Sequence, residues 1–202
     1  MIEIDGKFVE LQVLDALTER GFVRYRKFWV DKLIYPGFHC WIGLPLETRK
    51  GHIEVHPHVG IHSEEIEKML ASMSDPDEKI KYSRSNATYA LWLAAIENLP
   101  PTQRFIFSKE YSLEMIQLEA RRLAELCFTF GLNYAKSIAN YDSLVQLLKE
   151  CMGIYGGYPE RAAIALLLAG RKEEGVALIK EFSKERPSMF EYFICKLEAA
   201  KV

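Results

Sequence analysis

The clearest strand pattern in this chain is the stretch His52-Ile53-Glu54-Val55-His56-Pro57-His58-Val59-Gly60-Ile61-His62. Most of its odd positions are apolar and most of its even positions carry His or Glu, which is the period of two that a β-strand produces. Pro57 has no backbone N–H to donate to a neighbouring strand. The pattern therefore predicts a strand over residues 52–62 that lies at a sheet edge or is broken by a bulge at Pro57.

Segments on both sides of this strand carry strand signals of their own. Aromatic or alternating apolar residues predict further strands at residues 22–30, 38–46 and 104–107. Periodicity alone does not assign the apolar run at 88–96 to a strand or a helix, and its short length with Tyr89 and Trp92 favours a buried strand. Residues 47–51 are polar and end in glycine, so we expect a hairpin turn there. Because hairpin-length connections join antiparallel neighbours, the sequence predicts one antiparallel sheet of four to five strands.

Helix signals flank the strands and then dominate the rest of the chain. Apolar residues recur every three positions at 8–20, Ser63 is placed to cap a helix that runs to about residue 72, and further helices are expected at 112–127, 140–152, 159–170, 171–184 and from 188. Ser188 with Glu191 forms a capping box. The expected class is α+β, with an α+β domain at 1–152 and a helical appendage at 153–202 packed on it, joined by a flexible glycine-rich segment.

Composition limits the classes of function. Hydrophobic residues make up 49% of 202 residues, which is ample for a packed core, and the net charge of −2 gives no general attraction to nucleic acid or to an anionic membrane. We find no apolar run of about 20 residues and no signal peptide. The four cysteines form no C-x-x-C pair, so we expect them reduced, in a cytoplasmic protein without a membrane partner.

No catalytic motif is present in the sequence. The phosphate-binding and dinucleotide-binding glycine patterns, the nucleophile elbow and the paired zinc-binding histidines of metalloproteases are all missing. We therefore expect no catalytic residue, no cofactor and no enzymatic activity.

The histidine-rich strand is the one group of residues in the sequence whose side chains suggest a binding site. Its polar side chains are expected to share one face of the sheet: His52, Glu54, His56, His58 and His62. Two imidazoles with a carboxylate are typical metal ligands, a solvated face is the plain alternative, and a partner-binding surface that includes Trp41 is a third. Because Pro57 separates His56 from His58, we expect no catalytic metal centre.

A second candidate is a basic stretch with interleaved aromatic residues: Arg20, Arg24, Tyr25, Arg26, Lys27, Phe28, Trp29 and Lys32. Such a mixture is able to bind single-stranded nucleic acid. The chain as a whole is slightly acidic, so we favour an amphipathic strand whose basic side chains face water, with no nucleic-acid partner. The apolar neighbours of Cys127 and the strand positions of Trp29, Trp41 and Trp92 place these residues in or near the core.

The order of the predicted helices and strands resembles the layout of a known group of proteins. Its parts are the leading helix, the antiparallel strands, Arg104-Phe105-Ile106-Phe107, the helix from Ser112, Gly131-Leu132-Asn133-Tyr134 and the leucine-rich Tyr141-Asp142-Ser143-Leu144-Val145-Gln146-Leu147-Leu148. This layout resembles uncharacterised bacterial α+β proteins related to immunity proteins of polymorphic or type VI secretion toxins. Residues 165–178 look like one helical hairpin of the tetratricopeptide type, in which Gly175 lets two helices approach closely.

The resemblance implies a function by binding. An immunity protein neutralises a cognate toxin of the same cell by occluding the toxin's active site, and the expected contact residues are His52, Glu54, His56, His58, His62 and Trp41. Two alternatives stay open, a metal-dependent hydrolase that uses the strand at 52–62 and a housekeeping protein-interaction domain.

Overall fold

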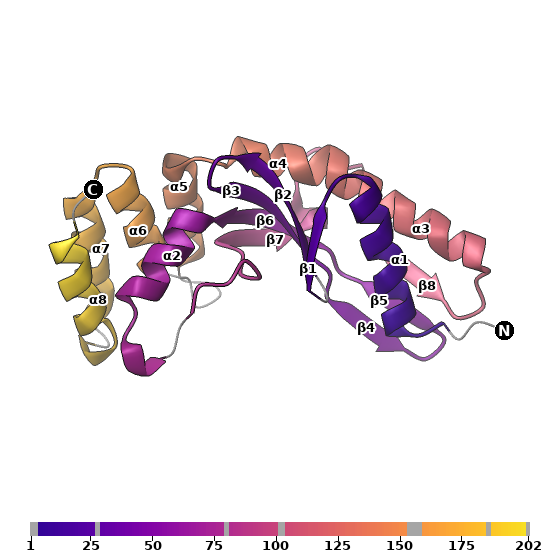
Figure 1. Ribbon diagram of the computed structural model, residues 1–202, viewed down its shortest axis with the longest axis horizontal. Helices are drawn as coiled ribbons and strands as arrows, with labels where there is room; N and C mark the ends of the chain where they lie inside the picture. The colour runs from indigo at the N-terminus through magenta and orange to yellow at the C-terminus, as the bar shows by residue number, and fades with distance from the viewer. Residues whose placement is uncertain are drawn as a thin grey trace. The chain divides into compact units, whose positions relative to one another are not determined.

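The computed structural model describes residues 4–26, 29–78, 81–100, 104–152, 159–184 and 187–200. Every described strand lies between residues 23 and 108, and the elements from residue 113 onward are helical (Figure 1). The predicted α+β class, with strands in the N-terminal half and helices in the C-terminal half, is therefore confirmed.

The strands form two sheets rather than one. The five-stranded sheet contains, in spatial order, β1 (Val23–Arg26), β2 (Trp29–Tyr35), β3 (Phe38–Gly43), β6 (His58–Ser63) and β7 (Tyr89–Trp92). The three-stranded sheet contains, in spatial order, β4 (Leu46–Arg49), β5 (His52–Val55) and β8 (Phe105–Ser108). The pairs β1/β2, β2/β3, β4/β5 and β5/β8 are antiparallel, as expected.

The predicted single strand at 52–62 is two strands in different sheets. The break falls at Pro57. Proline has no backbone N–H to donate to a neighbouring strand, so it fits the connection between two sheets better than a hydrogen-bonded position within a strand. The prediction of a sheet edge is wrong: β5 is the middle strand of its sheet, and β6 lies between β3 and β7. The two connections between the sheets lie side by side, since the His56 N–H donates to the Pro45 carbonyl at 2.9 Å.

Three other strand boundaries differ from the predictions. Residues 22–30 contain β1 and the start of β2, an antiparallel pair rather than one strand. The turn predicted at 47–51 is shorter, because β4 continues to Arg49 and Gly51 supplies the positive φ of 86°. The run at 88–96 contains β7, which is not buried, followed by a single 3₁₀ turn, Leu93–Ala95.

Three helices accompany the strands: α1 (Gly6–Glu19), α3 (Leu113–Leu126) and α4 (Leu132–Ser137). The Asp5 side chain caps α1 by accepting the Phe8 N–H at 2.7 Å, and Ser112 caps α3 as predicted. The π-helical turn Cys127–Gly131 joins α3 to α4. Helix α1 packs against α3 and against strands of both sheets, and α4 packs against β3.

The remaining helices are α2 (Glu64–Met73), α5 (Tyr141–Cys151), α6 (Pro159–Leu168), α7 (Lys172–Ser183) and α8 (Pro187–Ala199). Ser63 and Asn140 cap α2 and α5 as predicted. The helices α5 to α8 pack each against the next, and α2 packs against α6 and α8. A methyl group on Gly175 of α7 would lie 2.8 Å from the Ala163 carbonyl oxygen of α6, so these two helices do approach closely. The tetratricopeptide resemblance itself stays a prediction.

The packing divides the chain into two compact units that alternate along the sequence. One comprises Met1–Ile61 and Ala90–Ser137, the other His62–Tyr89 and Ile138–Val202. The predicted division after residue 152 adjoins residues 153–158, which lie outside the described part, as does the side chain of Ser188 in the predicted capping box. The predicted domain boundary therefore stays a prediction.

None of the four cysteines forms a disulfide; Cys40 and Cys127 are buried, as expected for core residues. Burial raises the pKa of the Cys127 thiol to about 12, so this sulfur stays protonated at neutral pH. Within the described residues, no helix has the length and the apolar character that crossing a bilayer requires.

Candidate functional site

One face of the five-stranded sheet packs on a helical segment. Lys32 of β2 places its ammonium 5.1 Å from the ring centre of Phe128, and a methyl group on Gly131 would lie 3.1 Å from a Val59 methyl of β6. Phe128 and Gly131 both belong to the turn Cys127–Gly131. Residues that alternate with Lys32 and Val59 therefore point to the opposite side of the sheet.

That opposite side carries an unusual number of exposed apolar side chains. The register pairs Leu33 with His39 and Val23 with Asp31, which places these four side chains on the same face. Leu33 is 61% exposed, although leucine is among the residues most often buried. We define the open face by its outward side chains: Val23, Leu33, Trp41, His58 and Trp92.

The open face also contains fixed polar groups. Asp31 and His39 form a buried pair, with Asp31 Oδ1 3.5 Å from His39 Nδ1. The indole N–H of Trp29 is buried and has no hydrogen-bond partner among the described residues. Such a donor costs about 1–3 kcal/mol when nothing accepts its hydrogen. The face therefore combines exposed apolar area with a buried, costly donor beneath it.

His58 lies at the margin of the open face beside Trp92. The two rings meet edge to face with their centres 6.0 Å apart, and His58 Nδ1 lies 3.0 Å from the His56 carbonyl oxygen. Burial lowers the pKa of His58, and the hydrogen bond to His56 opposes that effect only in part. The neutral ring is therefore favoured, and Trp92, expected in the core, is 63% exposed.

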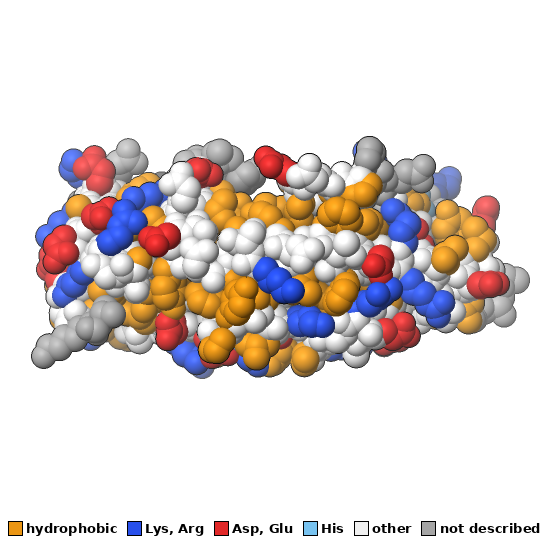
Figure 2. Space-filling view, turned by 90° about the horizontal axis from the view of Figure 1, so that it is seen from above, with side chains coloured by type: hydrophobic (Ala, Val, Ile, Leu, Met, Phe, Trp, Pro, Cys, Tyr) orange, Lys and Arg blue, Asp and Glu red, His pale blue; other side chains and the backbone are white. Residues whose placement is uncertain are grey.

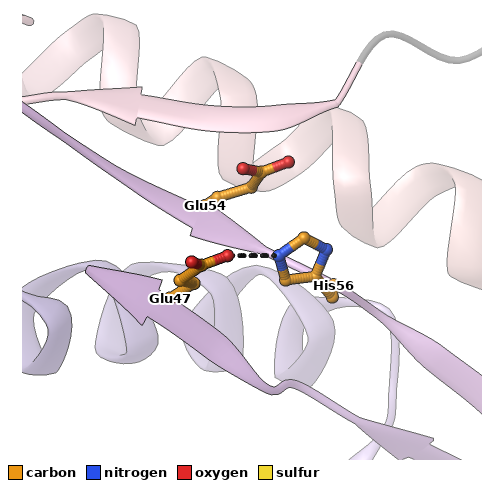
Figure 3. Close-up of side chains that lie close together, drawn as sticks. All are labelled: Glu47, Glu54 and His56. Carbon is orange, nitrogen blue, oxygen red and sulfur yellow. Dashed lines mark ion pairs between the residues drawn. The ribbon is translucent and has the colours of Figure 1, made fainter. Parts of the chain in front are cut away.

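The three-stranded sheet carries a separate charged cluster (Figure 3). Glu47 of β4 and Glu54 of β5 are direct cross-strand partners, and His56 follows β5. One ligand atom from each of the three lies within 4.8 Å of the others, and His56 Nε2 is 3.6 Å from Glu47 Oε2. Glu54 is buried, whereas Glu47 and His56 are open to solvent. We call these three residues the Glu–Glu–His cluster.

Two arginines border the Glu–Glu–His cluster. Arg49 donates to Glu47 Oε2 at 2.8 Å and lies 3.7 Å from Glu54, and Arg104 lies 3.6 Å from Glu54. The hydrogen bond from Arg49 lowers the pKa of Glu47, so this carboxylate stays ionised at neutral pH.

The predicted contact residues do not share one face. His58 and Trp41 lie on the open face, and Glu54 and His56 belong to the Glu–Glu–His cluster. His52 begins β5 opposite Arg49 and Ser108. His62 is fully buried, with its Nδ1 2.7 Å from the Asn86 carbonyl oxygen, which leaves no surface for a partner to contact.

Two basic residues of the stretch, Arg20 and Lys32, make contacts within the fold. Lys32 donates to the Arg20 carbonyl at 2.8 Å and covers the rings of Phe22 and Phe128. Arg20 forms an ion pair with Glu125. Lys27 and Phe28 lie outside the described residues, as does the side chain of Arg26.

The sequence interpretation missed the two residues that matter most for these surfaces. The sequence pattern predicts a turn at Glu47, and Leu33 lies between two predicted strands. The sequence does signal that a strand ends after Tyr35, because Pro36-Gly37 forms the centre of a tight turn in which Gly37 has a φ of 79°. It does not signal that Leu33 is exposed.

Comparison with protein-family models finds no match for this chain, and comparisons with curated proteins and with solved structures find no match either.

Proposed function

We propose that this protein acts by binding a partner protein through the open face, and that the partner is a toxin of the same cell. The exposure of Leu33 and Trp92 on one sheet face is the observation that carries the proposal. Large apolar side chains gathered on a surface mark interaction sites, because leaving them in water forgoes about 25 cal/mol per Å² of burial. Trp and Tyr are also the residues that most often dominate binding energy.

The chemistry of the open face indicates the kind of surface that it fits. Its exposed side chains are apolar or aromatic, and its carboxylate, Asp31, is buried beside His39. The partner is therefore expected to present an apolar patch that covers these side chains. In this proposal the protein is not an enzyme, works in the cytoplasm and blocks the toxin's active site, as the resemblance to immunity proteins implies.

The immunity function is tested by co-expression with the product of the adjacent gene. That product is expected to stop growth alone, and this protein is expected to restore growth. The Leu33→Glu variant is expected to lose the rescue, because it places a charge in the centre of the contact. A neighbouring product that is harmless alone, or a toxic one that this protein neither binds nor neutralises, would show that the immunity proposal is wrong.

A matched control separates the open face from other exposed apolar surfaces. Leu118 on α3 is 68% exposed, so Leu118→Glu makes the same chemical change at a similar exposure. Rescue that survives Leu33→Glu and fails with Leu118→Glu would move the interface to α3. Rescue that fails only with changes on the outer surface of α7 would favour a docking role for the helical hairpin instead.

A further inference from the structure

We propose that Glu47, Glu54 and His56 form a binding site for a divalent transition-metal ion, with Zn²⁺ as the best fit. The site is separate from the open face, and the proposal does not depend on the toxin-binding function. Its first support is position: a strand pair fixes two carboxylates opposite each other, and the segment after β5 brings an imidazole to the same place (Figure 3).

The second support is the state of Glu54. Burial leaves this residue only 3% exposed. Its charged neighbours, Arg49 and Arg104, remain at 3.7 and 3.6 Å, beyond hydrogen-bond reach. A buried carboxylate whose counter-charges stay at these distances is incompletely compensated, and a directly bound cation compensates it more fully.

The third support is the like-charge pairing of Glu47 with Glu54. Carboxylates directly opposite each other on neighbouring strands destabilise a sheet. Arg49 relieves the repulsion mainly at Glu47, to which it donates a hydrogen bond. A metal ion between the two carboxylates relieves the repulsion at both, because one oxygen of each carboxylate coordinates the ion.

The donor set selects the class of metal. Imidazole nitrogen with two carboxylate oxygens suits Zn²⁺ better than Mg²⁺, which prefers oxygen ligands alone. The ligand atoms are at most 4.8 Å apart, and binding at about 2.0–2.2 Å requires the exposed Glu47 and His56 to move toward the buried Glu54. Three protein ligands leave one position of a tetrahedral ion for water.

The two arginines compete with the metal ion for the carboxylates. The side chain of Arg104 is 73% exposed, so it is able to turn into solvent when a cation enters. A positive charge near the site repels Zn²⁺, and its removal is therefore expected to strengthen binding. This sign distinguishes a metal site from a network of surface ion pairs, in which removing Arg104 changes no metal affinity.

The test is isothermal titration of the full chain, freed of metal by a chelator, with Zn²⁺ and separately with Mg²⁺. One Zn²⁺ per chain is expected, with much weaker Mg²⁺ binding. His56→Ala and Glu47→Gln are expected to weaken Zn²⁺ binding more than about tenfold. Both residues are exposed enough to be changed without loss of the fold, which circular dichroism checks. Arg104→Gln is expected to tighten binding several-fold.

The matched control is His52→Ala, which removes a histidine of the same strand that is not part of the Glu–Glu–His cluster. Its affinity for Zn²⁺ is expected to equal that of the wild type. The proposal is overturned if Zn²⁺ does not bind with saturable one-to-one stoichiometry, if His56→Ala binds as tightly as the wild type, or if His52→Ala weakens binding as much as His56→Ala.

Discussion

At the level of single residues, the ion pair between Arg161 of α6 and Glu67 of α2 is buried and bidentate. The guanidinium donates to both carboxylate oxygens, at 2.6 and 2.8 Å, and the Thr88 hydroxyl donates to the same carboxylate at 3.0 Å. Because α2 comes from the N-terminal half of the sequence, this pair ties it to the C-terminal helices.

Arg161→Met is therefore expected to destabilise the protein by about 3–5 kcal/mol, because it leaves the Glu67 carboxylate buried without its counter-charge. Urea unfolding measures the change in the free energy of unfolding. The double variant Arg161→Met with Glu67→Leu is the control, and it is expected to recover more than half of the loss. A double variant less stable than the single one would show that the unpaired charge is not the cause.

His58 gives the stability a dependence on pH. Burial keeps the pKa of His58 in the folded protein below its ordinary value of 6.5. Below pH 6.5 the unfolded chain therefore binds more protons at this residue than the folded protein does, so the stability that it contributes is present above pH 6.5 and is lost as pH falls through its folded pKa.

His58→Gln is accordingly expected to flatten the stability curve below pH 6.5, which urea unfolding between pH 5 and 8 measures. His52→Gln is a control for the loss of a histidine as such. An unchanged acid slope in His58→Gln would show that burial of this ring does not set the pH dependence.

At the level of elements, the contact between α6 and α7 depends on Gly175. Alanine is normally favoured over glycine within a helix by about 1 kcal/mol. Here the added methyl would lie 2.8 Å from the Ala163 backbone oxygen, so the helices must separate, at a cost of about 1–3 kcal/mol. Thermal unfolding of Gly175→Ala is therefore expected to show a lower midpoint than the wild type.

Gly6→Ala makes the same substitution at the first residue of α1, where the nearest atom would be the Thr48 hydroxyl oxygen at an ordinary 3.6 Å. We expect this control to be neutral or slightly stabilising. A Gly175→Ala variant as stable as the wild type, or more stable, would show that α6 and α7 leave room for the added methyl group.

Helix starts were predictable because their signals are local. Ser63, Ser112 and Asn140 each accept a hydrogen bond from an N–H three residues ahead, which sequence spacing reveals directly. Strand pairing is not local. The alternation at 52–62 indicates which side chains share a face of a strand. It does not indicate that the chain passes from one sheet to the other at Pro57.

The candidate sites were predictable only in part, for the same reason. Glu54 and His56 stood out because histidines cluster near them. Their third partner, Glu47, is joined to them by the pairing of β4 with β5, which no spacing in the sequence reveals. The exposure of Leu33 likewise depends on which face of its sheet the helical segment covers.

At the level of the whole molecule, the surface distribution of side chains bears on function. Figure 2 shows one side of the molecule, on which hydrophobic side chains gather in several areas with Lys and Arg between them. Apolar area is thus exposed in more than one place, including Leu113, Met115 and Leu118 on α3. The proposal for the open face is therefore tested by comparing a substitution on that face with the same substitution on α3.

The most direct test is the affinity of the purified toxin for the wild type, Leu33→Glu and Leu118→Glu, measured by titration. If the open face is the interface, Leu33→Glu is expected to lose roughly 2 kcal/mol or more of binding free energy, about thirtyfold in Kd, because a charge enters a desolvated contact. Leu118→Glu is expected to bind like the wild type. Wild-type affinity in Leu33→Glu, with the fold intact, would contradict the account.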